Sequence, residues 1–192
     1  HFRDAGLPWL FLEAFLLMGS FVTLFNYIGY RLLADPYNMN QAVVGLLSIV
    51  YLSGIYSSAK IGALADRLGR RRVLWGTIVL MLAGLALTMF TALPLVIFGM
   101  LVFTFGFFAA HSVASSWIGR RATKAKGQAS SLYLFSYYAG SSIAGTAGGV
   151  FWHLGGWNGI GLFIGGLLLV ALLVALKLAK LPPLPSARDV AP

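Results

Sequence analysis

The sequence predicts an all-α membrane protein whose chain crosses the bilayer six times. Its composition is the first observation, because 59% of the 192 residues are hydrophobic and only 10% are charged. A soluble domain of this length does not need so much apolar surface, so the bilayer is the expected solvent. The second observation is that long uncharged runs alternate with short basic clusters. Continuous apolar runs favour helices over the alternating strands of a membrane barrel.

Each apolar run can be measured against the roughly 20 residues that one helical crossing needs. Residues 73–119 and 127–176 carry no Asp, Glu, Lys or Arg, and each run is long enough for two crossings. Pro94 divides the first run, because proline fits the first turn of a helix. The turn-rich stretch 153–159 divides the second. Two further crossings precede these runs. The expected spans are 8–33, 43–65, 73–91, 95–118, 128–152 and 159–178.

The basic residues predict the orientation of the bundle. Six crossings put both termini on one side, and every Lys and Arg except Arg31 falls at that side, with Lys60 just inside it. Short loops rich in Lys and Arg stay in the cytoplasm, so both termini are expected there. Residues 1–180 would form the bundle and residues 181–192 a disordered cytoplasmic tail. Arg31, at the other side, is expected to pair with Asp35 or to anchor its loop.

The same distribution of charge limits the partners. The formal net charge of +9 would raise the question of nucleic acid in a soluble protein, but here it is explained by topology. The chain has no cysteine, which excludes disulfides and thiolate metal sites. We therefore expect no nucleic acid, no metal and no cofactor.

A dense group of charges, "GALADRLGRRRVL" at residues 62–74, separates the second and third expected spans. Basic side chains suit the negative end of a helix dipole, and the glycines suit a sharp turn and a close helix contact. The positive-inside rule does not explain Asp66, because its side chain is acidic. It could bind neighbouring arginines, or accept N–H groups from the positive end of another helix. The candidate gating residues are Gly62, Asp66, Arg67, Gly69, Arg70 and Arg71.

This stretch resembles the signature loop of the major facilitator superfamily, G-x-L-x-D-R-x-G-R-R-x-x-L, at every fixed position. The resemblance covers the whole chain, because six spans with this loop between the second and third are the pattern of one facilitator half. It implies one bundle of two inverted three-helix repeats, which is half of a secondary active transporter that moves a small molecule by alternating access. It also implies that Asp66 contacts the opposite half when the cytoplasmic side is closed.

Two features favour a particular half and branch. The chain has no initiator Met, so it is expected to be the C-terminal half, whose partner is an N-terminal six-helix half. Residues 130–145, "SSLYLFSYYAGSSIAG", are similar to the eleventh helix of the sugar and drug efflux permease branch. That similarity implies proton-coupled efflux across a bacterial inner membrane. The expected partners are a small-molecule substrate, protons and the lipid bilayer.

Polar residues within the spans are the candidates for the transport path, because a polar face should point to protein or water and not to lipid. Glu13 lies about five residues into the first span, where an acid is costly. It could share a proton with His111 or pair with Lys60, and a purely structural role stays open for each residue. The candidate coupling and cavity residues are Glu13, Ser20, Asn26, Tyr27, Tyr30, Thr104, Phe108, His111, Tyr137 and Tyr138.

The fifth expected span allows two interpretations of its side chains. Tyr137 and Tyr138 could stack on a flat or amphipathic substrate, or they could serve hydrogen bonding between helices. The small residues Gly140, Ala144 and Gly148 recur at four-residue spacing, which predicts a close-packing face.

Two other classes of protein fit the sequence less well than a transporter half. An intramembrane serine protease needs G-x-S-G, but "YLSG" at 51–54 and "AGSS" at 139–142 each lack one glycine. There is also no HExxH and no pair of intramembrane aspartates, so no enzyme is expected. A stand-alone six-span protein that homodimerises stays open, because the signature loop needs a partner half in either case.

Overall fold

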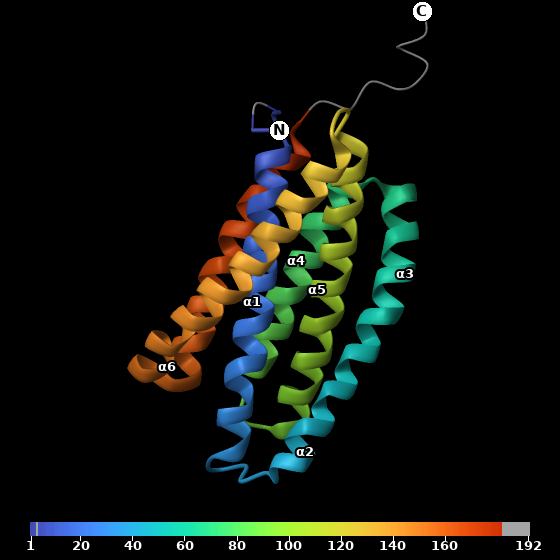
Figure 1. The fold of residues 1–192 in the computed structure, drawn as a ribbon. Coiled ribbons are helices and arrows are strands. Elements are labelled where there is room, and N and C mark those ends of the chain that lie inside the picture. Colours follow the sequence, from blue (N-terminus) through green and yellow to red (C-terminus); the bar gives the residue numbers. More distant parts are fainter. Residues whose placement is uncertain (3, 182–192) are drawn as a thin grey trace, which may run out of the picture.

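The computed structural model describes residues 1–2 and 4–181, and every element in that part of the chain is helical. Figure 1 shows the long helices side by side along one axis, with successive long helices running in opposite directions. The prediction of an all-α chain is confirmed for these residues. In chain order the elements are α1 (Leu7–Leu33), α2 (Gln41–Leu46), the 3₁₀ turn η1 (Leu47–Val50), α3 (Tyr51–Leu68), α4 (Arg70–Thr88), α5 (Leu93–Arg121) and α6 (Lys126–Ala179).

Local sequence explains where several helices begin. Pro8 and Pro94 stand in the first turns of α1 and α5, where the missing proline N–H costs no helical hydrogen bond. The side chain of Asn40 accepts the N–H of Ala42 at 2.8 Å and caps α2. Gly69 joins α3 to α4 with a φ of +90°, a conformation that a residue with a Cβ rarely adopts. The tight junction of α3 and α4 therefore depends on glycine.

Within the described part of the chain, five helical segments are long and apolar enough to cross a membrane, so the predicted count of six is not confirmed. The difference lies in α6, a 54-residue helix that takes the place of the expected spans 128–152 and 159–178. A straight helix of that length would reach about 80 Å, far more than the roughly 30 Å of a hydrocarbon core. Non-helical dihedral angles at Gly155 and Gly156 interrupt α6 instead.

The chain reverses direction at this interruption. Figure 1 shows the two parts of α6 folded back beside each other. The rings of Phe151 and Phe163 stack across the bend, with centroids 4.3 Å apart and planes inclined by 13°. We call residues 126–154 the first arm of α6 and residues 157–179 the second arm. The first arm begins, and the second arm ends, near the start of α1 and the end of α5. We call this end of the bundle the basic end.

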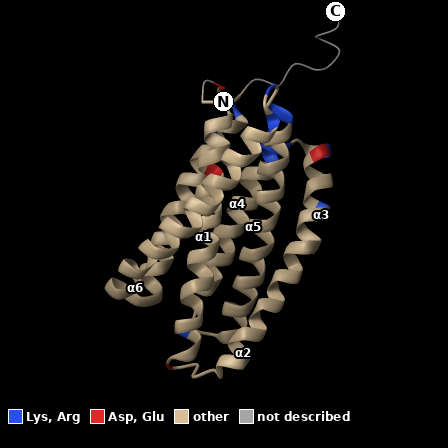
Figure 2. Ribbon diagram, viewed as in Figure 1, with Lys and Arg blue, Asp and Glu red and all other residues tan. Residues whose placement is uncertain are grey.

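The charges divide the bundle as the sequence predicts. Figure 2 shows Lys and Arg gathered at the basic end, where α3 and α5 end and α4 and α6 begin. Arg31 lies in the last turn of α1, at the opposite end. The expected disordered tail lies outside the described residues, apart from Leu181. Which end faces the cytoplasm stays a prediction.

Small residues bring α1 and the first arm of α6 into close contact. A Cβ on Gly140 would overlap the backbone of Phe15, and one on Gly19 would come within 2.8 Å of the Cβ of Ala144. A Cβ on Gly148 would lie 2.7 Å from the ring of Tyr27. The predicted close-packing face is therefore confirmed, and it packs against α1.

Arg31 does not pair with Asp35, so that expectation is wrong. Its guanidinium instead donates hydrogen bonds to the carbonyl oxygens of Thr88 and Phe90, the latter at 2.7 Å, and lies 5.3 Å from the ring centroid of Trp157. Carbonyls at a helix C-terminus have no partner within the helix, and they attract cations. The other expected role of Arg31, as an anchor, is compatible with these contacts. They join α1 to the end of α4 and to α6.

At the basic end, Asp4 ties α1 to α5. Its Oδ1 accepts the backbone N–H groups of Gly6 and Leu7, each at 2.8 Å, and the Nε–H of Arg121 at 2.5 Å. Burial raises the pKa of Asp4, but the hydrogen bonds from Arg121 and the two backbone groups outweigh it. The pKa of Asp4 therefore lies below its ordinary value of 3.8.

The lowered pKa of Asp4 predicts a pH dependence of stability. A carboxyl whose pKa is lowered in the folded state stabilises the fold above its unfolded pKa, and that share is lost as the pH falls through the folded value. The melting temperature of the purified protein should therefore drop more steeply below pH 3.8 than that of Asp4→Asn. Arg121→Met should flatten the same part of the curve. Equal slopes for all three proteins would contradict the pair.

Candidate functional site

A pocket of about 200 Å³ lies between α5 and the first arm of α6. One wall carries His111, whose Nδ1 is 3.0 Å from the hydroxyl oxygen of Tyr133. Tyr133 is itself buried, with 3% of its surface exposed. The hydroxyl of Tyr133 is also 3.5 Å from the backbone carbonyl oxygen of His111. The residues that line the pocket are His111, Ser115, Ile118, Ser130, Tyr133 and Leu134.

An aromatic cluster extends from this pocket to α1 and α3. The ring of His111 lies 5.0 Å from Tyr137 and stacks on Phe107 at 6.0 Å. Phe107 in turn stacks on Phe21 of α1 at 4.1 Å, with planes inclined by 16°. Such pairs contribute beyond the area that they bury and fix the orientation of each ring. The cluster comprises Phe21, Phe25, Tyr51, Phe107, Phe108, His111, Tyr133, Tyr137 and Tyr138.

Glu13 is fully buried in α1, and neither of its carboxyl oxygens has a hydrogen-bond partner among the described residues. It lies six residues from the start of α1, or about 9 Å of helical rise. Both expected partners are therefore wrong. The Nδ1 of His111 faces Tyr133, and Lys60 is exposed on α3 with its Nζ 6.0 Å from the ring centroid of Tyr56. A buried acid without a partner is a costly feature of a membrane helix, so a functional role is the first hypothesis.

The other polar candidates of α1 fall into two groups. Ser20 is fully buried and donates to the carbonyl of Leu16 within its own helix, so it does not face a cavity. Tyr27 and Tyr30 pack near Trp152 of α6, and the Tyr27 hydroxyl donates to the carbonyl of Gly145 at 3.1 Å. Asn26 is exposed beside the same contact. The structure places none of these residues at the His111 pocket.

The candidates of α5 and α6 are split as well. Phe108 and Tyr137 belong to the aromatic cluster, and Tyr138 is 65% exposed at its edge. Thr104 lies two turns below His111, fully buried, and its hydroxyl oxygen has no partner among the described residues. Only part of the predicted set therefore gathers in one place.

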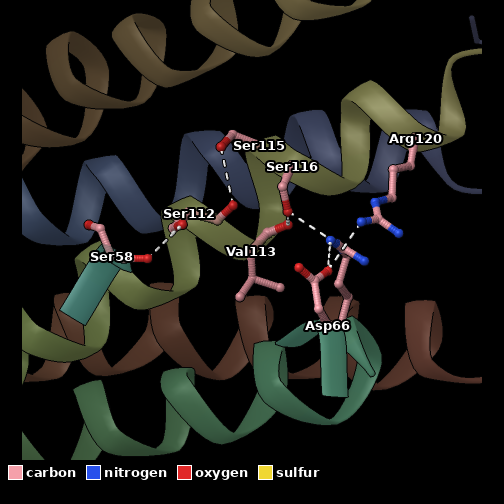
Figure 3. A network of polar contacts seen from close by, with 8 residues as sticks. Ser58, Asp66, Ser112, Val113, Ser115, Ser116 and Arg120 are labelled. Carbon is pink, nitrogen blue, oxygen red and sulfur yellow. Dashed lines mark hydrogen bonds and ion pairs between the residues drawn. The ribbon is translucent and has the colours of Figure 1, made fainter. Parts of the chain in front are cut away.

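The signature loop forms a polar network with α5, and Figure 3 shows how its side chains lie. Oδ1 of Asp66 accepts the guanidinium N–H groups of Arg70 at 2.5 Å and Arg120 at 3.2 Å. Nε–H of Arg70 donates to Ser116 at 3.1 Å. Asp66 keeps 53% of its side chain exposed, so solvent screens these ion pairs. The network joins the ends of α3 and α5 and leaves Asp66 accessible to another partner.

The remaining loop candidates make fewer contacts. A Cβ on Gly62 would lie 3.6 Å from the hydroxyl of Ser112, which is an ordinary contact, so glycine is not required here for packing within this bundle. Arg67 is exposed and Arg71 is half-buried. Among the described residues, no group of three or more His, Cys, Asp or Glu side chains could hold a metal ion.

Tyr133 is a site residue that is not among the candidates predicted from the sequence. It precedes Tyr137 by four residues, so both side chains lie on one face of α6. Phe107 stands in the same relation to His111 on α5 and was also missed. The i, i+4 spacing was the signal that could have found both residues.

The long apolar helices and the basic network at Asp66 define an integral membrane protein. The model of the Major Facilitator Superfamily matches residues 10–191. The chain therefore belongs to this family, which confirms the resemblance of its signature loop.

Relatives of the chain are named as transporters. It is 65% identical over 180 residues to the inner membrane transport protein YnfM of Escherichia coli K12. It is 50% identical over 189 residues to the uncharacterized MFS-type transporter YybF of Bacillus subtilis 168. These matches cover 94% and 98% of this chain but only 43% and 47% of the relatives. The chain therefore spans less than half of their length.

Proposed function

We propose that this chain forms one half of a secondary active transporter that moves a small molecule across a bacterial inner membrane by alternating access. Family membership and the names of the relatives support the class. The short share of each relative that the chain covers is compatible with a second half. The two bundles would rock against each other around a site between them.

The bundle would cross the membrane six times. The bend at Gly155 and Gly156 supports this, because each arm of α6 is long enough for one crossing. Both ends of this chain would then lie on the side that carries the basic residues, which is the cytoplasm by the positive-inside rule. Asp66 would exchange its contacts with Arg70 and Arg120 for a helix of the second half when the cytoplasmic side closes.

One observation supports proton coupling: the carboxyl group of Glu13 is fully buried and has no hydrogen-bond partner in the part of the chain that the structure describes. Ionising a carboxyl group in an apolar interior without a partner costs several kcal/mol. Glu13 would therefore hold a proton in this state and release it when a rearrangement brings water or a cationic substrate. Coupling a proton to a conformation in this way is what an antiporter requires, and the resemblance to efflux permeases supports the outward direction.

Replacement of Glu13 tests the proposal. The full-length protein with Glu13→Gln should lose gradient-driven transport to the level of empty inverted vesicles, because glutamine has nearly the same size but cannot exchange a proton. Equilibrium exchange of substrate should persist. A panel of cationic dyes and small sugars, added while the proton gradient is followed, would identify a transported compound.

The matched control for this test is Asp35→Asn, the same chemical change in an exposed loop at the opposite end. It should transport like the wild type. Full gradient-driven transport by Glu13→Gln would remove Glu13 as the coupling acid. A wild type that moves substrate without moving protons would overturn the coupling altogether.

A further inference from the structure

We propose that the pocket between α5 and the first arm of α6 is an entry subsite for the substrate, and that it binds an uncharged group with a carbonyl, ether or hydroxyl oxygen. In this subsite Nε2–H of His111 donates a hydrogen bond to that oxygen. The inference rests on the proposed transporter function and adds the chemical class of the group that is recognised. It concerns residues that neither the signature loop nor Glu13 explains.

The hydroxyl of Tyr133 selects which nitrogen of His111 carries the proton. It lies 3.0 Å from Nδ1 of the ring and 3.5 Å from the backbone carbonyl oxygen of the same residue. Because a hydrogen bond weakens with distance, the hydroxyl donates to the nearer acceptor, the lone pair of Nδ1. A neutral imidazole has one N–H group, which is then the one at Nε2. Tyr133 is therefore a positioning residue that makes His111 a donor.

Nε2 of His111 is accessible to a ligand. The described residues offer it no hydrogen-bond partner, yet it is not one of the buried side-chain atoms that lack a partner, so part of its surface is open. The side chain of His111 is half-buried and lines the pocket. Since Nδ1 faces Tyr133, Nε2–H is the polar group that this ring can offer to an occupant.

The other walls of the pocket suit an uncharged group. Its lining in the described part of the chain includes no Asp, Glu, Lys or Arg. The hydroxyl of Ser115 donates to the carbonyl of Ser112 at 3.3 Å, whereas Ser130 is exposed, and Ile118 and Leu134 supply apolar contacts. A charged group would lose water here without gaining a counter-charge, whereas a neutral oxygen exchanges its water for N–H and O–H donors.

The pocket lies where a substrate that moves outward would enter. His111 precedes Arg121 by ten residues on α5, and Ser130 follows Lys126 by four on α6, or about 15 and 6 Å of helical rise from the basic end. That end is cytoplasmic in the proposed orientation. The volume of about 200 Å³ is below the roughly 300–1,000 Å³ of pockets that enclose a drug-sized ligand. The subsite therefore holds one end of a larger substrate, or a small one entirely.

Three aromatic probes of similar size test the chemical class. Benzamide is uncharged and carries a carbonyl oxygen, benzylammonium is a cation, and benzoate is an anion. In the ¹⁵N-histidine-labelled full-length transporter, millimolar benzamide should shift the Nε2 resonance of His111, which is assigned by its loss in His111→Gln. The two ions should shift it much less, because the pocket does not compensate their lost hydration. His153, near the bend of α6, should respond to none of the probes.

Tyr133→Phe tests the positioning role in the same spectra. Without the donor to Nδ1, the ratio of the Nε2–H to the Nδ1–H form of His111 should fall about fivefold, as expected from the loss of one ordinary hydrogen bond. The response to benzamide should weaken with it. The matched control is Tyr138→Phe, at an exposed residue whose hydroxyl is not bonded to a described residue, and its ratio should stay at the wild-type value.

A third measurement keeps Tyr133 intact and does not require that variant to fold. The chain has no cysteine, so an introduced thiol is unique within it. Leu134→Cys, in the wall of the pocket, should react with a methanethiosulfonate reagent about threefold more slowly when benzamide is present at twice its dissociation constant, because about a third of the sites are then free. Lys126→Cys, exposed on the same helix but outside the lining, should react at one rate with and without benzamide.

The inference is overturned if benzamide leaves the Nε2 resonance or the reaction of Leu134→Cys unchanged, or if either ion acts as strongly as benzamide. An unchanged tautomer ratio in Tyr133→Phe would also overturn it. None of these readouts depends on transport. Normal gradient-driven transport by Glu13→Gln together with a benzamide response would refute the role of Glu13 and leave the subsite in place. The reverse pair of results would refute the subsite alone.

Discussion

Gly140→Ala should destabilise the protein by about 2–3 kcal/mol, the upper range for an overfilled core. The added Cβ would overlap the backbone of Phe15, and a backbone cannot turn aside as a flexible side chain can. Relief would require α1 to separate from the first arm of α6, and the contacts of Gly19 with Ala144 and of Gly148 with Tyr27 would loosen with it. The free energy of unfolding, measured in mixed micelles with increasing SDS, checks this value.

The matched control is Gly166→Ala on the same helix. A Cβ at Gly166 meets no atom within 4 Å, and its backbone is helical. Replacing glycine by alanine within a helix gains roughly 0.5–1 kcal/mol, so this variant should be as stable as the wild type or more stable. The two substitutions should therefore differ in sign. A Gly140→Ala protein as stable as Gly166→Ala would contradict the packing of α1 against α6.

Arg31→Met should cost about 3 kcal/mol of unfolding free energy, since hydrogen bonds from a charged group contribute about 1.5–3 kcal/mol each and do not add fully. The substitution keeps an unbranched apolar side chain but removes the donor that Arg31 offers to the carbonyls of Thr88 and Phe90. The cation also contacts the ring of Trp157, whose Nε1–H donates to the same Thr88 carbonyl at 3.0 Å. One side chain thus holds three helices at the opposite end of the bundle.

Two further variants calibrate this result in the same SDS titration. Arg31→Lys keeps the charge but has no planar fork to reach two carbonyls, so its loss should be intermediate. Arg72→Met removes an arginine whose side chain is exposed, and it should change stability by less than about 0.5 kcal/mol. If Arg31→Met matches Arg72→Met, the contact with α4 does not stabilise the fold.

Most of the fold follows from local features of the sequence. Proline at positions 8 and 94 and glycine at 69 act within one turn, so the helix boundaries beside them could be predicted. The stretch 153–159 was expected as a break, and the bend at Gly155 and Gly156 lies within it. The helix count differed because two glycines suffice to reverse the chain, so a separate loop is not needed.

The candidate site depended on contacts between helices, which the sequence shows less directly. The depth of Glu13 in the membrane could be predicted by counting residues along its own span. Its partners could not be predicted, because two residues at similar depth on different helices need not face each other. The structure shows Nδ1 of His111 beside the hydroxyl of Tyr133, and Glu13 has no hydrogen-bond partner among the described residues. Likewise, Arg31 binds backbone carbonyl groups, which every residue carries. The side chains of Thr88 and Phe90 therefore could not predict this contact.

The bend of α6 has a mechanical consequence. The first arm is pressed against α1 at Gly140, and the second arm meets α4 at Thr88 and Met89. Only Gly155 and Gly156 separate the two arms. Because this connection is so short, a shift of one arm along its axis must move the other arm as well. The two arms therefore connect α1 to α4 through a short bend.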